Sequence, residues 1–258
     1  MTRIRPVAGS RADLHADAAA GRDHDPAAEL SAPRNLPADT VHVWCLDLDE
    51  LVLPDGGDCL DAQERQRAAR LQHAADRRRH RAAHCALRHI LAGCTGQEPA
   101  ALRTERRCPR CGPSPHGKPV WSAGAGRAAV DVNLSHSDHI AMVAVARAPL
   151  SVGIDVERVR AGIRWATVLA DPDAGSGLSD QDGTRIWTRL EAVGKAAGTG
   201  MADRPVLGGA QPGGWTAASV PALGGGWSVR DLAAPQGFVA ALAVDALPAN
   251  RTVTVTLC

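Results

Sequence analysis

Two short segments carry side chains whose types and spacing suit metal and phosphate chemistry. In the first, Ser-Val-Gly-Ile-Asp-Val-Glu (151–157), Asp155 and Glu157 stand one residue apart within an apolar run. Alternate side chains of an extended strand point to the same face, so both carboxylates would lie together, opposite the apolar residues. Two carboxylates this close repel each other unless a cation, a proton or solvent relieves them. The segment therefore predicts either a cation site or a half-buried antiparallel strand with a hydrated acidic face.

The second segment, residues 186–200, places Trp187, Glu191 and Lys195 at positions i, i+4 and i+8. This spacing puts the three side chains along one face of a helix, and glycines near its end supply a stop. The segment is either an ordinary surface helix with a Glu–Lys pair or the source of a third carboxylate beside the acidic strand. Three carboxylates, together with waters and phosphate oxygens, suit Mg²⁺.

Length and composition set broad limits. The chain has 258 residues, a formal net charge of +1 and seven cysteines, an odd number that favours reduced thiols over a disulfide framework. No apolar run reaches the length of a membrane span, and no apolar signal-peptide core is present. We therefore expect a cytoplasmic protein. Residues 1–40 lack apolar periodicity and are predicted to be a disordered leader.

The elements that must position these residues alternate between strand and helix patterns. Residues 60–92 form the longest helical block, with a break near 72–75 that predicts two helices. The block carries eight arginines, and acids such as Glu64 and Asp76 offset only part of their charge. This excess indicates either a solvated face or a site for a phosphate-rich ligand.

Alternating apolar residues predict a first strand at 41–48 and a hairpin at 130–146, with Ser135 and His136 close to its polar bend. Further strands are expected at 215–220, 227–232, 238–244 and 252–257. This order predicts an α+β protein built of two halves, residues 41–150 and 151–258, with the acidic strand near their junction.

A Cys-x-x-Cys pair, Cys108 and Cys111, is followed closely by His116. A closed zinc site needs four ligands, and Cys94 is the nearest spare thiol. The alternatives are a structural Zn²⁺ site and a Pro/Gly-rich loop with free thiols. The loop ends in Gly117-Lys118-Pro119, in which the glycine permits close backbone approach and Lys118 offers a point charge.

Several stretches taken together resemble the surfactin-type 4′-phosphopantetheinyl transferase family over about residues 41–245. The helical block with Asp76, Arg79 and Leu87-Arg88 is also similar to that family. Any single piece is weak, whereas four in the family's order are a strong signal. The four are Gly117-Lys118-Pro119, Asn133-Leu134-Ser135-His136-Ser137, Gly153-Ile154-Asp155-Val156-Glu157, and Trp187-Thr188-Arg189-Leu190-Glu191-Ala192 with Lys195.

The resemblance implies a pseudo-twofold α+β fold whose site lies between the halves and binds coenzyme A and Mg²⁺. The implied reaction moves the phosphopantetheine arm onto a serine of an apo acyl or peptidyl carrier protein and releases adenosine 3′,5′-bisphosphate. It implies a monomer that acts on neither nucleic acid nor membrane. By match, the metal ligands are Asp155, Glu157 and Glu191; the phosphate contacts are His136 and Lys195, with Ser135 beside them; the adenine border is Gly117, Lys118 and Pro119; and the 3′-phosphate contacts are Arg79 and Arg67. Glu191 is the candidate base for the serine proton, with Lys195 and His136 as its catalytic partners.

The chain departs from the family pattern in three places. Leu190 stands where the family usually has a lysine, Gly194 and Gly198 weaken the helix, and the connection between 157 and 187 is short. A homologue that binds coenzyme A or a carrier domain without transferring anything is therefore the alternative. A nucleic-acid-binding protein or metal-dependent nuclease, using the arginines and carboxylates, is a third hypothesis, which the lack of an aromatic platform disfavours.

Overall fold

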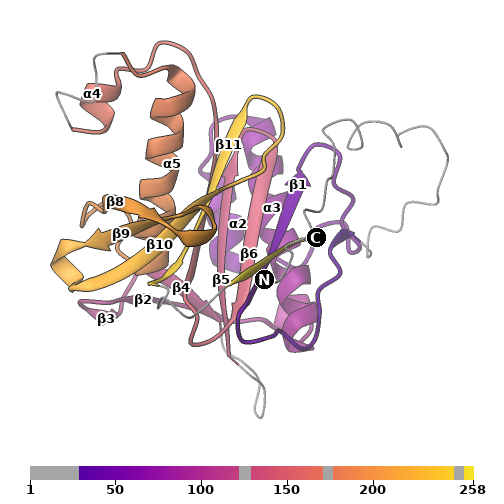
Figure 1. Cartoon of the computed structure of the whole chain (residues 1–258). Helices are drawn as coiled ribbons and strands as arrows, with labels where there is room; N and C mark the ends of the chain where they lie inside the picture. The colour runs from indigo at the N-terminus through magenta and orange to yellow at the C-terminus, as the bar shows by residue number, and fades with distance from the viewer. Residues whose placement is uncertain (1–28, 122–128, 171–176, 247–252) are drawn as a thin grey trace, which may run out of the picture.

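The computed structural model describes residues 29–121, 129–170, 177–246 and 253–258. Its elements form two main sheets with helices packed on them and a small third sheet, which is a mixed α+β arrangement (Figure 1). The described helices include none that is long and apolar enough to cross a membrane. The prediction of a disordered leader lies outside the described residues for positions 1–28.

The first sheet has the strand order β12-β1-β6-β5, and it confirms the predicted first strand and hairpin. The last strand of the chain pairs in parallel with β1, so the sequence-defined halves share this sheet. The other pairs are antiparallel. The strands are β1 (Thr40–Asp47), β5 (Val130–Ser137), β6 (Ile140–Arg147) and β12 (Thr254–Leu257).

Helices α2 (Ala62–Ala69) and α3 (Ala74–Thr95) confirm the predicted break in the helical block. Asp61 and Glu64 form a capping box that starts α2. The apolar side of α3 packs with β1 residues such as Trp44 in one buried cluster. Leu30 and Leu36 are buried in the same cluster, so positions 29–39 of the expected leader belong to the packed fold. Burial of each leucine removes its apolar side chain from water and stabilises the fold by about 2 kcal/mol. This stabilisation explains why the segment is packed on the core.

The second sheet has the order β7-β11-β10-β9-β8 and is antiparallel throughout. Helix α5 (Asp180–Ala197) packs on it, while the short α4 (Trp165–Val168) precedes that helix. Figure 1 shows α5 standing beside the strands of this sheet. The strands are β7 (Val152–Arg158), β8 (Val206–Gln211), β9 (Trp215–Val220), β10 (Gly225–Leu232) and β11 (Phe238–Asp245).

The two sheets meet where β5 runs beside β7, and polar side chains of β5 join them. The Asn133 amide oxygen accepts a hydrogen bond from the Ile154 backbone N–H at 3.1 Å. Further along, Ser137 Oγ accepts from the Arg158 backbone N–H at 3.2 Å. A buried apolar cluster that includes Met142 and Leu242 spans both sheets. The alternation of β5 therefore serves a second purpose, because its polar face binds the neighbouring sheet.

A third, small sheet with the order β3-β2-β4 was not predicted from the sequence, since its strands are too short to show a pattern. Its strands are β2 (Thr104–Cys108), β3 (Gly112–Pro113) and β4 (Lys118–Trp121). The described residues also include three single-turn 3₁₀ helices: η1 (Pro99–Ala101), η3 (Pro212–Gly214) and η4 (Pro221–Leu223).

Candidate active site

Strand β7 places its carboxylates beneath helix α5. Gly153 makes this possible, because a Cβ at that position would lie 2.1 Å from the Ala192 carbonyl oxygen of the helix. The close approach of helix and strand buries Asp155, which is only 2% exposed. The hydrated acidic face that the strand pattern allowed is therefore wrong for Asp155, while Glu157 is half-buried.

Lys195 of α5 reaches across to this strand. Its Nζ lies 2.6 Å from Asp155 Oδ1 and 2.9 Å from Ser135 Oγ of β5. Ser135 Oγ also donates to Asp155 Oδ1 at 2.7 Å. The other carboxylate oxygen, Asp155 Oδ2, is buried and has no hydrogen-bond partner within the described residues. A buried carboxylate oxygen left in this state costs free energy, and it marks a place for a cation or a donor.

Two further carboxylates share this environment. Burial raises the pKa of Glu157, and repulsion from Asp155 adds to the rise, although a hydrogen bond from Ser137 Oγ at 2.8 Å opposes it. Burial likewise raises the pKa of Glu191, again with repulsion from Asp155 and then from Glu157. The pKa of Asp155 is also raised by burial, despite Lys195. All three acids have pKa values raised by burial, and those of Glu157 and Glu191 are raised further by their acidic neighbours, so a bound cation would be strongly favoured here.

The donor set fits Mg²⁺ when water completes the shell. The ligand oxygens of Asp155, Glu157 and Glu191 do not all lie within 4.8 Å of one another. Mg²⁺ commonly keeps several waters and contacts one or two carboxylates directly, so a wider arrangement remains compatible with it. Asp155 and Glu157 come from β7 and Glu191 from α5, and Lys195 already takes one oxygen of Asp155.

A cleft of about 1300 Å³ opens beside this cluster. It lies between the small sheet, α2, β5 and the end of α5. The predicted site residues that line it are Arg67, Gly117, Lys118, Pro119, Ser135, His136 and Lys195. These seven residues share the cleft, whereas Arg79 and the three carboxylates do not line it. The acidic cluster is reached from the cleft through Ser135 and Lys195.

Arg106 of β2 is a cleft residue that sequence reasoning missed. It lines the cleft with Arg67, and its pKa is lowered by burial and then by the nearby Arg67 charge. Its Nη1 donates to the Gly117 carbonyl oxygen at 2.9 Å. Two guanidinium groups that repel each other at one cleft are a suitable site for an anion. The sequence offered no signal for this, since Arg106 is one of two adjacent arginines in a five-residue strand.

A histidine cluster also escaped prediction. The rings of His80 and His84 lie 4.3 Å apart on α3, and His80 lies 5.8 Å from His136. Burial, with His84 as the next cause, lowers the pKa of His80 to about 4, and burial followed by the His84 and Lys195 charges lowers the pKa of His136. The i, i+4 spacing of His80 and His84 was the available sequence signal. His136 is exposed to the cleft and available to a ligand.

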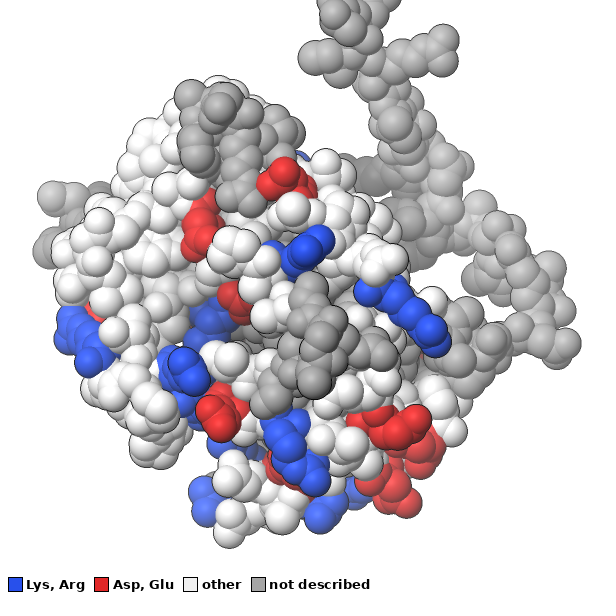
Figure 2. Space-filling model, turned by 90° about the horizontal axis from the view of Figure 1, so that it is seen from below, with Lys and Arg blue, Asp and Glu red and all other residues white. Residues whose placement is uncertain are grey.

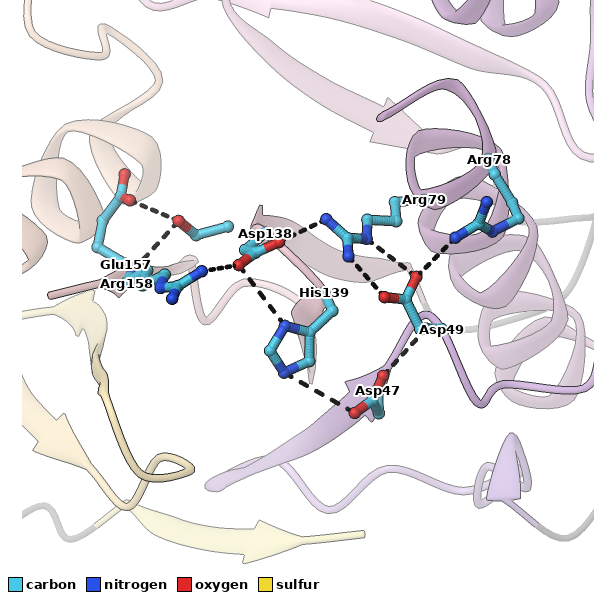
Figure 3. Close-up of polar contacts among 9 residues, drawn as sticks. Asp47, Asp49, Arg78, Arg79, Asp138, His139, Glu157 and Arg158 are labelled. Carbon is cyan, nitrogen blue, oxygen red and sulfur yellow. Dashed lines mark hydrogen bonds and ion pairs between the residues drawn. The ribbon is translucent and has the colours of Figure 1, made fainter. Parts of the chain in front are cut away.

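Arg79, the predicted 3′-phosphate contact, lies in an ion-pair network outside the cleft lining. Its guanidinium donates from Nε to Asp49 Oδ1 at 2.9 Å and also pairs with Asp138 in the β5–β6 turn (Figure 3). Asp138 in turn pairs with Arg158 of β7, so the network joins α3 to the second sheet. Arg79 does not line the cleft, and its guanidinium is held in ion pairs with Asp49 and Asp138.

Other arginines of the two arginine-rich helices are also held in ion pairs. Arg88 is fully buried and pairs with Glu64 and Asp61, and Arg78 pairs with Asp49. Asp49, which precedes the helical block, thus supplies charge that local sequence counting did not include. On the face shown in Figure 2, basic and acidic side chains are interspersed and do not form one continuous basic surface.

Lys118 lines the cleft but is not a free point charge. Its Nζ contacts Asp131 Oδ2 at 2.6 Å, Ser151 Oγ at 2.9 Å and the Val152 carbonyl oxygen at 2.7 Å. These three contacts use all its donors. Burial lowers the pKa of Lys118, opposed by the Asp131 charge. Its ammonium group therefore ties β4 to the start of β7, while its neighbours Gly117 and Pro119 remain at the cleft wall.

The sequence departures have clear structural roles. Leu190 is 6% exposed and packs with Trp165 and Leu169, on a side of α5 that does not line the cleft. Gly198 is the left-handed C-cap of α5 and ends the helix. The prediction that it weakens the helix interior is therefore wrong. Gly194 allows the chain to fold back, because a Cβ there would lie 2.4 Å from the Gly200 carbonyl oxygen.

Comparison with known proteins decides the family. No family model matches the chain. The chain is 31% identical over 187 residues to the 4′-phosphopantetheinyl transferase HetI of Nostoc sp. strain PCC 7120, which covers 67% of this chain and 76% of HetI. This chain belongs to the 4′-phosphopantetheinyl transferase family. The mixed α+β architecture is compatible with that membership.

Proposed function

We propose that this protein transfers the 4′-phosphopantetheine arm of coenzyme A to a serine of an apo acyl or peptidyl carrier protein, with Mg²⁺. The product of the nucleotide part is adenosine 3′,5′-bisphosphate. We further propose the surfactin-type branch of the family, on the order of the four motifs that end at Lys195. A cytoplasmic monomer is the expected form of the protein.

One observation carries the proposal. Asp155 Oδ2 is buried without a hydrogen-bond partner among the described residues, and Asp155 raises the pKa of both Glu157 and Glu191. Such a cluster is costly for the fold alone. It is well suited to a divalent cation that also contacts a diphosphate, which supplies the compensating charge.

The cleft has groups for both ends of a nucleotide diphosphate. Lys195 and His136 lie at the acidic end and would contact diphosphate oxygens. Arg67 and Arg106 would bind the 3′-phosphate of the ribose, which replaces the predicted contact from Arg79. Gly117 and Pro119 would border the adenine. Positive groups at two separate points favour a ligand with two phosphate-bearing ends.

The chemistry then follows from this arrangement. When bound, Mg²⁺ would neutralise charge on the diphosphate. The carrier serine oxygen forms a bond to the phosphorus that bears the pantetheine arm, and the bond from that phosphorus to the diphosphate bridging oxygen breaks. Glu191 would accept the serine proton, because its raised pKa brings it closer to the working pH of a base. Lys195 and His136 would stabilise the leaving phosphate.

The predicted pseudo-twofold relation of the two halves is part of the proposal. With β12 left aside, the first strand of each half pairs with the last strand of that half, which pairs in turn with the strand before it: β1-β6-β5 and β7-β11-β10. Helices α3 and α5 follow the first strand of each set along the chain. These correspondences support two related halves. The shared strand β12 is then an addition to the first half.

The alternative is a family member that binds coenzyme A or a carrier domain without transfer. Leu190, at the position of the family's lysine, is the observation that favours it. Leu190 is buried on a side of α5 that does not line the cleft. Its presence therefore removes no charge from the cleft wall, which weakens that alternative.

The test uses the full chain with coenzyme A, Mg²⁺ and a panel of apo carrier proteins, followed by intact mass. We expect one carrier to gain the mass of one phosphopantetheine group. Asp155→Asn should reduce the rate by about 100-fold or more, while Asp182→Asn, which alters an exposed carboxylate at the start of α5, should leave it unchanged. Coenzyme A binding without a mass gain on any carrier would favour the alternative. Unchanged transfer by Asp155→Asn would contradict the site.

A further inference from the structure

The turn between β2 and β3 brings three metal-ligating side chains together outside the acidic cluster. Cys108 ends β2, Cys111 follows after two residues, and His116 precedes β4. Their ligand atoms all lie within 4.8 Å of one another. This is a separate site, because none of the three residues belongs to the Asp155 cluster.

The backbone of the turn brings the two cysteines together. Gly112, at φ +72°, adopts the left-handed conformation that lets the turn close on the second cysteine. Two cysteines at this spacing are common ligands of zinc.

A second glycine brings His116 to the cysteines. Gly117 has φ +93°, and a Cβ there would lie 2.3 Å from the Arg107 carbonyl oxygen. The loop before β4 therefore crosses directly over the end of β2, which carries His116 back to Cys108. A simple cysteine pair gives no reason for this third ligand to converge.

The fourth thiol considered from the sequence does not take part. Cys94 is buried in the core of the first sheet, with residues such as Leu91. Cys108, Cys111 and His116 instead line the cleft. A metal held by these three side chains would have one coordination position open toward the cleft, which water can fill.

We propose that Cys108, Cys111 and His116 bind one zinc ion, with water as the fourth ligand. Two thiolates and one imidazole are a donor set that selects zinc over Mg²⁺, so this ion is distinct from the one proposed at the acidic cluster. Its role is to fix the turn that forms one wall of the cleft.

The position of the turn explains why fixing it would matter. Pro109 Cδ lies 3.5 Å from the point that a Cβ on Gly198 would occupy. Gly198 caps the end of α5. Arg110 forms an ion pair with Asp203, beyond the same helix. The turn is therefore packed against the end of the helix that carries Lys195. Zinc binding would stabilise this contact as well as the small sheet.

The first experiment measures metal in the full chain, purified without a chelator, a metal-affinity column or an oxidant. Elemental analysis should find about one zinc per chain, as expected for a Cys₂His site. Cys111→Ser and His116→Ala should each lower zinc content or weaken zinc binding at least tenfold. The matched control, Cys258→Ser, removes an exposed thiol at the chain end and should retain the metal. Replacement of zinc by Co²⁺ should give the thiolate-to-metal absorption of a tetrahedral site, which His116→Ala should alter.

Two outcomes would overturn the proposal. One is zinc below about 0.1 per chain together with no uptake of added Zn²⁺ by the reduced protein. The other is zinc that Cys258→Ser lowers as much as Cys111→Ser does. In the first case, a Cys108–Cys111 disulfide in the freshly purified protein would assign the pair to redox chemistry instead. If the cysteine variants do not fold, His116→Ala and chelator titration of the unaltered chain still decide. These readouts do not depend on phosphopantetheine transfer.

Discussion

Lys195 and Asp155 lie 2.6 Å apart, Nζ to Oδ1, and join helix α5 to strand β7 at the acidic cluster. The pair satisfies only one oxygen of the carboxylate, since Asp155 Oδ2 has no partner among the described residues. One lysine thus faces an acidic group whose neighbours, Glu157 and Glu191, also carry potential negative charge. The free energy of the cluster should therefore depend on both protons and divalent cations.

The stability of the chain should fall with rising pH in a way that Mg²⁺ reverses. The pKa values of Asp155, Glu157 and Glu191 are all raised by burial from ordinary values of 3.8, 4.5 and 4.5. The folded protein then holds more protons than the unfolded chain above about pH 4, so this cluster's contribution is present below that pH and is lost as pH rises through the raised pKa values. Thermal unfolding with a chelator, measured between about pH 5 and 8, should show the loss, and added Mg²⁺ should raise Tm most at the higher pH.

The control for this prediction is the variant Glu157→Gln with Glu191→Gln. It removes two of the titrating groups, so both the pH-dependent loss and the Mg²⁺ shift should shrink. Asp182→Asn alters an exposed carboxylate at the start of α5, paired with Arg185, and should keep the pH dependence and the Mg²⁺ shift of the unaltered chain. A Mg²⁺ shift of equal size in the double variant would show that the ion binds elsewhere.

Arg106 and Arg79 should differ in their effect on coenzyme A. Arg106 lines the cleft beside Arg67, so Arg106→Gln should weaken coenzyme A binding about tenfold, the loss of one charge-assisted contact. Arg79 is held by Asp49 and Asp138 outside the cleft lining, so Arg79→Gln should leave binding within about twofold while it lowers stability. Calorimetric titration of both variants makes the comparison. Dephospho-coenzyme A, which lacks the 3′-phosphate, should bind Arg106→Gln and the unaltered chain equally.

A reversal of these two effects would restore Arg79 as the phosphate contact. In that case the ion pairs with Asp49 and Asp138 would have to exchange for the ligand. Coenzyme A binding that is unchanged in both variants would show that neither arginine contacts the phosphate.

Gly153 should be essential for the contact of strand and helix, in contrast to Gly209. A Cβ at Gly153 would lie 2.1 Å from the Ala192 carbonyl oxygen and 2.4 Å from the Ala196 nitrogen, which are backbone atoms that cannot move alone. Gly153→Ala should therefore cost about 3 kcal/mol in the free energy of unfolding and reduce transfer, because α5 must shift away from β7. Gly209→Ala meets no atom within 4 Å and serves as the matched control. Urea unfolding measures both, and equal stability of the two variants would contradict the packing.

The acidic strand and the helix could be predicted because their spacing carries the information. Asp155 and Glu157 follow the period of a strand, and Glu191 and Lys195 follow the period of a helix. The capping glycine at 198 also gave a local stop signal, although its place as the C-cap became clear only in the structure. Local periodicity thus defined both elements that meet at the cluster.

The partners of the charged residues could not be predicted in the same way. Arg79 pairs with Asp49 and Asp138, which lie 30 and 59 residues away along the chain. The donors of Lys118 are likewise taken by groups up to 34 residues away. Such contacts depend on how the sheets meet, and a single sequence records no distance between them. The resemblance to a family supplied roles for these residues but not their actual partners.

Leu190→Lys, which would restore the family's residue, should lower stability and should not raise activity. Leu190 is 6% exposed and packs with Trp165 and Leu169, so a lysine there would bury an unpaired ammonium group unless its stem reached solvent. We expect a loss of about 3 kcal/mol in the free energy of unfolding, whereas Leu190→Met should be nearly neutral because it conserves volume. Unfolding in urea and the transfer rate should be measured together. A stable Leu190→Lys variant with a higher rate would mean that the missing charge is a real deficit and that this side of α5 can turn toward the diphosphate.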